Sequence, residues 1–133
     1  MANKFFPRGA QKVLGASINL ATDTIKAALV PDSYTYTETH EYLNQLGTIV
    51  GAAVELTGKT VVGGVFDADD PAFGALAAGS TVKAVVLFKD TGNPATSPLV
   101  CYLDVITGFP FSTNGGTVSA NWSDGSAKIL SLV

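Results

Sequence analysis

The sequence predicts an all-β protein, an antiparallel β-sandwich of about seven or eight strands with one short helix and an N-terminal arm. Apolar and β-branched runs recur every 10 to 18 residues, and clusters of Gly, Pro, Asn and Ser separate them. One run, residues 81–89, is apolar on both faces, so we expect it at the centre of a sheet. The strand order stays open, because a jelly-roll and an immunoglobulin-like Greek key both fit this pattern.

The chain begins with a polar segment that precedes the first strand. Residues 1–16 are broken by Pro7 and form an arm that makes at most one helical turn. Alternating side chains then predict a first strand over residues 24–30, which ends at Pro31. The 133 residues match the size of one domain with one core, so we expect a single domain over residues 1–133.

The next segment combines a helical pattern with a hairpin pattern. Apolar residues at helical spacing ahead of Gly47 predict a short helix near residues 38–46. Two β-rich runs then flank the turn signal at Thr57–Gly58. We therefore expect residues 48–56 and 59–66 to pair as a hairpin.

The second half of the chain reads as strands throughout. A turn ending at Pro71 leads into a short extended piece, and residues 81–89 and 99–107 are expected to pair antiparallel across the loop between them. Residues 117–122 alternate, and a turn at 124–125 leads into a last strand over 128–133. Two sets of residues are each expected on one face of their strand: Val82, Ala84, Val86 and Phe88, and Val118, Ala120 and Trp122.

The composition indicates a protein that works by contact with other subunits. Hydrophobic residues make up 47% of the chain and charged residues 14%, about half the usual charged share. The mean hydropathy is +0.31. A free monomer would expose much of this apolar surface, so we expect an assembly protein and a homo-oligomer.

Charge and segment lengths exclude several classes of partner. The net charge is −3, and the eight basic residues are scattered singly, so no basic stripe is available for direct nucleic-acid binding. No apolar stretch reaches the length of a membrane span, and no signal-peptide pattern follows the first residues. We expect no membrane association.

Few residues offer chemistry. His40 is the one histidine and Cys101 the one cysteine, which lies in an apolar run and reads as a buried small hydrophobe. The acidic group Asp67, Asp69 and Asp70 reads as a chain-reversing loop and offers at best a weak metal site. Nucleophile and phosphate-loop motifs are absent. We expect no enzyme activity, no catalytic or metal-binding residue and no cofactor.

Two aromatic groups are candidate binding elements. Phe5 and Phe6 precede Pro7 and Arg8 in the arm, where exposed phenylalanines would need a partner to cover them, so these four residues are the predicted interface. The remaining aromatics could instead form a sugar-binding platform, although core packing is the simpler interpretation. They are Trp122, Tyr34, Tyr36, Tyr102 and the Phe109–Phe111 segment.

Five segments resemble small structural proteins of tailed double-stranded-DNA bacteriophages. They are residues 2–14 (ANKFFPRGAQKVL), 18–30 (INLATDTIKAALV), 35–43 (TYTETHEYL), 88–99 (FKDTGNPATSPL) and 114–122 (NGGTVSANW). The resemblance spans nearly the whole chain and brings no catalytic motif. It implies a virion component that is made in the host cytoplasm.

Among virion parts, a capsid decoration or cement protein fits the size, the β-sandwich character and the apolar, low-charge surface of this chain best. Such a protein lies on the capsid exterior and clamps major capsid subunits, or other virion subunits, by binding alone. Two alternatives stay open: a tail or head-tail connector subunit, and a carbohydrate-binding β-sandwich module.

Overall fold

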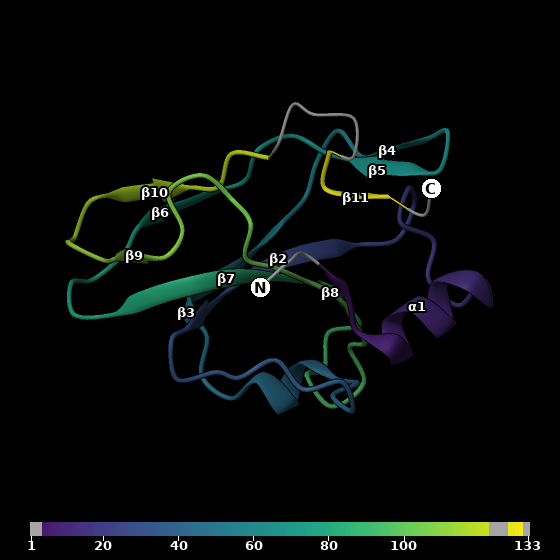
Figure 1. Ribbon diagram of the computed structural model, residues 1–133, viewed down its shortest axis with the longest axis horizontal. Coiled ribbons are helices and arrows are strands. Elements are labelled where there is room, and N and C mark those ends of the chain that lie inside the picture. Colours follow the sequence, from purple (N-terminus) through teal and green to yellow (C-terminus); the bar gives the residue numbers. More distant parts are fainter. Residues whose placement is uncertain (1–3, 123–127, 132–133) are drawn as a thin grey trace.

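The computed structural model describes residues 4–122 and 128–131, and it confirms an all-β, antiparallel, sandwich-like fold (Figure 1). The main sheet has the strand order β1-β8-β7-β2-β3, and β9 pairs with β7 beyond that path. All of these pairs are antiparallel. The strands are β1 (Lys4–Phe5), β2 (Ile25–Pro31), β3 (Val50–Glu55), β7 (Thr81–Lys89), β8 (Leu99–Leu103) and β9 (Phe111–Ser112).

Two small sheets cover one face of the main sheet, and a long loop covers the other (Figure 1). One small sheet pairs β10 (Thr117–Ser119) with β6 (Ala72–Ala75). The other has the order β11-β5-β4, made of β4 (Thr60–Val62), β5 (Val65–Asp67) and β11 (Leu130–Ser131). The described residues thus form eleven strands, more than expected, because several are only two or three residues long.

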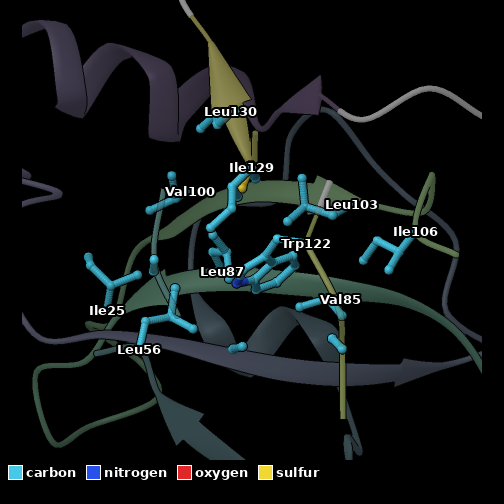
Figure 2. Close-up of a cluster of buried hydrophobic side chains, with 14 of the residues drawn as sticks. Ile25, Leu56, Val85, Leu87, Val100, Leu103, Ile106, Trp122, Ile129 and Leu130 are labelled. Atoms are coloured by element: carbon cyan, nitrogen blue, oxygen red, sulfur yellow. The ribbon is translucent and has the colours of Figure 1, made fainter. Parts of the chain in front are cut away.

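The larger core lies between the main sheet and the small sheets. Figure 2 shows Trp122 at its centre, beside Val85, Leu87 and Leu103 of the main sheet and below Ile129. All of these side chains are buried. Trp122 therefore packs as a core residue, as its alternation with Val118 and Ala120 predicts.

The smaller core lies on the opposite face of the main sheet. Ala28, Val86 and Phe88 point into it from the strands, and Phe6 and Tyr34 cover them. Burial on both faces confirms that β7 is the central strand.

One residue of β7 lies on the opposite face from the one predicted. Val82 packs in the larger core, whereas Ala84 and Val86 pack in the smaller one. Strand β2 explains this difference, because consecutive residues Val30 and Pro31 pair with Ala84 and Val82 and leave one β7 residue between them as a bulge.

The predicted hairpin of residues 48–56 with 59–66 is wrong. Strand β3 pairs with β2, and β4 pairs with β5 across a turn at Gly63–Gly64. Both glycines have positive φ, +59° and +80°, as a two-residue hairpin turn requires. Glycine tolerates these angles, so the chain reverses direction within residues 59–66, which the sequence pattern predicts as one strand.

The predicted helix near residues 38–46 is wrong in extent, since only a 3₁₀ turn, η1 (Leu43–Leu46), forms there. Backbone groups of this segment form hydrogen bonds with β8 and the loop before it: Leu43 N–H donates to Ser97 O, and Leu99 N–H donates to Glu41 O. The one α-helix among the described residues is α1 (Pro7–Leu14), inside the segment predicted as an arm. The predicted turn at 124–125 lies outside the described residues, as does the end of the last strand.

Candidate functional site

The best candidate for a functional site is an apolar groove between α1, the β4–β5 hairpin and β11. Its volume is about 320 Å³. Strands β4, β5 and β11 belong to one small sheet, and Phe5 of β1, Val13 of α1 and the loop of residues 16–21 supply the rest of the lining. Figure 1 shows where these elements lie. Its main apolar lining residues are Phe5, Val13, Ile18, Val61, Phe66 and Leu130.

Exposed apolar side chains occur on two of the elements that line this groove. Val61 on β4 lines it and is 51% exposed. Leu14 on α1 follows the lining residue Val13 and is 76% exposed. Val62 is 74% exposed, but it points to the opposite face of β4 from Val61, because side chains alternate along a strand. An apolar groove with exposed valine and leucine side chains on its elements is typical of a contact surface. We call Leu14, Val61 and the groove the apolar surface.

The structure corrects one premise of the predicted interface. Phe6 is fully buried, its ring stacks on Tyr36 with centroids 5.0 Å apart, and its N–H donates to Val100 O over 3.0 Å. Phe5 is half-buried and lines the groove. Pro7 begins α1, and Arg8 is exposed. Phe6 is thus part of the core, and a partner contact through Phe5, Pro7 or Arg8 stays a prediction.

Two ion pairs join α1 to Glu41, which lies in the loop before η1. Lys12 Nζ lies 2.5 Å and Arg8 Nη1 3.4 Å from the Glu41 carboxylate. The hydrogen bond from Lys12 is the main reason that the pKa of Glu41 lies below its ordinary value of 4.5, and the charge of Arg8 adds to it. The folded state therefore favours the carboxylate form of Glu41.

We expect the ion pairs with Glu41 to weaken in acid. A lowered folded pKa gives stability that is complete above the unfolded value and disappears as the pH falls through the folded one. Between about pH 6 and about pH 3, Glu41 should contribute at most about 1 kcal/mol of lost stability, because the pair is partly exposed. Urea unfolding at both pH values should show a gap between wild type and Glu41→Gln that closes in acid. A gap that stays constant would contradict this expectation, and Glu38→Gln is the control because Glu38 forms no ion pair among the described residues.

The single histidine and cysteine have packing roles. His40 Nδ1 lies 2.9 Å from the Tyr34 hydroxyl, at the rim of a hollow of about 780 Å³ beside Leu46 and Ser80. Cys101 is fully buried in β8, and burial raises the pKa of its thiol. His40 lies beside Tyr34, a residue of the smaller core, whereas the Cys101 side chain packs in the larger core on the other face of the main sheet.

Two of the acidic residues, Asp69 and Asp70, form hydrogen bonds that hold their own loop in place. Asp70 Oδ1 accepts the Trp122 N–H over 2.8 Å, and Asp69 O accepts the indole N–H over 3.1 Å. Thr57 Oγ1 donates to the Asp69 carboxylate over 3.4 Å. Within residues 4–122 and 128–131, no group of three or more His, Cys, Asp or Glu side chains is placed to hold a metal ion.

The aromatic residues do not form one exposed platform. Trp122, Tyr34 and Tyr102 are buried, and Tyr36 packs edge-on against Tyr102 with centroids 5.5 Å apart. Phe109 and Phe111 contact each other, and β9, which contains Phe111, lies at the opposite end of the fold from α1 (Figure 1). The stacking surface that a sugar site needs is therefore divided between two cores and a loop.

Comparison with known proteins gives no further guidance, since no protein-family model, curated protein or solved structure matches the chain. In the part of the chain that the structure describes, no helix is long and apolar enough to cross a membrane.

Of the residues of the apolar surface, the sequence predicts only Phe5 as part of an interface. Val61 falls in a predicted paired strand, and Leu14 falls in the predicted arm. The Gly63–Gly64 pair is the available signal for β4, because a two-residue glycine turn divides residues 59–66 into two short strands. The edge position of β4 follows from the pairing of β5 with β11, which the sequence does not reveal.

Proposed function

We propose that this protein is a structural component of a tailed-bacteriophage virion, a capsid decoration protein that binds the outside of the shell and strengthens it. Its partners would be the major capsid protein or other virion subunits, and its mechanism would be binding alone. The resemblance of five segments to phage structural proteins supports the class. The observation that carries the proposal is the apolar surface of Leu14, Val61 and the groove.

A rigid support favours binding through this surface. The ion pair with Glu41 holds α1 against the loop before η1, and β4 is paired with β5. Little conformational freedom is therefore lost when a partner covers them. Many copies on one shell would act together, which lets a weak contact at each copy add up to stable attachment.

A tail or head-tail connector subunit would use the same kind of contact and remains the second candidate. A carbohydrate-binding module has less support, because Trp122 is only 7% exposed and its indole N–H is already bonded to Asp69 O. Stacking on a sugar would require that ring to leave the core.

The test is cryo-EM of purified virions of the phage that encodes this chain. We expect density for the protein on the capsid lattice. Density only at the tail would replace the decoration proposal with the second candidate, and particles without the protein would overturn both.

A surface variant tests the contact itself. Leu14→Glu places a charge on the apolar surface, and we expect about a tenfold or greater loss of particle binding. Since Leu14 is 76% exposed, folding should change little. Val105→Glu, at a residue that is 63% exposed but outside the groove lining, is the matched control. Equal binding by both variants would remove Leu14 from the interface.

A further inference from the structure

Strand β4 has an open edge. It pairs with β5 on one side, and no strand among the described residues pairs with its other side. Figure 1 shows β4 on the outer side of β5, away from β11. Its three residues are all exposed, and none of them is charged. An edge of this kind is a template for another strand.

The register fixes which backbone groups face outward. Val62 and Val65 close the two-residue turn and so exchange backbone hydrogen bonds, whereas the next pair, Val61 with Phe66, does not. The other side of β5 agrees with this assignment, because Phe66 O accepts Ile129 N–H over 3.2 Å and so points toward β11. The N–H and C=O of Val61 therefore point away from β5, toward the open edge.

We propose that β4 pairs with β4 of a second copy, antiparallel and centred on Val61. In this register, Val61 faces Val61 of the partner and the two exchange both backbone hydrogen bonds. Thr60 then faces Val62. Lys59, the one charged residue beside the strand, faces Gly63, so that no like charges oppose each other. The two three-stranded sheets would become one continuous sheet of six strands.

The size of the contact predicts its strength. Three residues a side bury far less than the roughly 1,200 Å² of a stable interface, so the isolated pair should be weak and concentration-dependent. This inference deepens the proposed function by naming a contact between neighbouring copies. It is tested without particles, so its failure would leave capsid binding untouched.

The experiment is sedimentation equilibrium from about 10 μM to about 1 mM, a range suited to weak pairs. Wild type should shift from monomer toward dimer across this range. Val61→Lys and Val61→Glu should each stay monomeric, because two like charges would meet at the two-fold axis. An equimolar mixture of the two variants should dimerise again, since Lys then faces Glu. Only a contact in which residue 61 meets itself predicts this rescue.

Two further variants separate pairing from folding. Val61→Pro removes an outward N–H that β5 does not use, which an edge strand tolerates, so it should fold and stay monomeric. Val105→Lys should dimerise as wild type does. The inference is overturned if wild type remains monomeric at the highest concentration, if the charged or proline variants dimerise as wild type does, or if the mixture fails to dimerise.

Discussion

Gly9→Ala should lower the free energy of unfolding by about 3 kcal/mol, the upper range for overpacking a core. A Cβ at this position would lie 2.3 Å from Leu99 O, 2.7 Å from Val100 O and 2.9 Å from Val100 Cα. All three atoms belong to the backbone of β8, so no side-chain rotation relieves the contact. Helix α1 would have to move away from the sheet.

Overpacking and helix propensity predict opposite changes in stability for Gly9→Ala, so the measurement separates the two. Glycine in an exposed helix is about 1 kcal/mol less favourable than alanine, so helix propensity alone predicts that Gly9→Ala stabilises the protein. Gln11→Ala, at an exposed position of the same helix, is the control and should change stability by less than about 0.5 kcal/mol. Urea unfolding followed by circular dichroism measures both variants. A stabilised Gly9→Ala protein would show that α1 does not pack against β8.

Because α1 packs directly against β8 at Gly9, partner binding is better tested by exposed substitutions than by deletion of the N-terminal segment. Removing residues 1–12 would delete Phe6 from the smaller core and most of α1, so lost binding would follow from unfolding. A single exposed change such as Leu14→Glu leaves those contacts in place. The N-terminal segment is part of the sandwich, and only its outer face is available to a partner.

Alternation along single strands predicted much of this fold. Apolar residues on both faces of residues 81–89 predicted the central position of β7. The residues Val118, Ala120 and Trp122, predicted to point inward, are half-buried or buried. Val82 was placed on the wrong face because a bulge depends on the register with β2, which no pattern within β7 records. Strand partners were likewise inaccessible, since β2 meets β7 across more than fifty residues of chain.

The N-terminal segment was misread for a different reason. Pro7 interrupts it, and α1 is held by one buried phenylalanine, one glycine contact and ion pairs to a loop distant in sequence. None of these features has a periodicity. A glycine inside a helical segment was the available signal, because it marks a place where another backbone approaches closely.

Trp122→Ala should remove about 3 to 5 kcal/mol of stability, the usual cost of deleting a buried tryptophan. The ring fills the centre of the larger core in Figure 2, and its indole N–H and backbone N–H both bond to the 69–70 loop. The change would leave a cavity and an unpaired Asp69 carbonyl. Since Trp122 is the only tryptophan, unfolding must be followed by circular dichroism.

Trp122→Phe separates this packing role from sugar binding. Phenylalanine keeps most of the apolar contact and loses the bond to Asp69 O, so we expect a smaller loss of about 1 to 3 kcal/mol. On the wild-type protein, tryptophan fluorescence should resist quenching by iodide, because the ring is 7% exposed. Strong quenching, together with glycan binding that a folded Trp122→Phe protein lacks, would place the ring at the surface and favour the carbohydrate-binding alternative. Weak quenching and a large loss of stability in Trp122→Ala would contradict the carbohydrate-binding alternative at this residue.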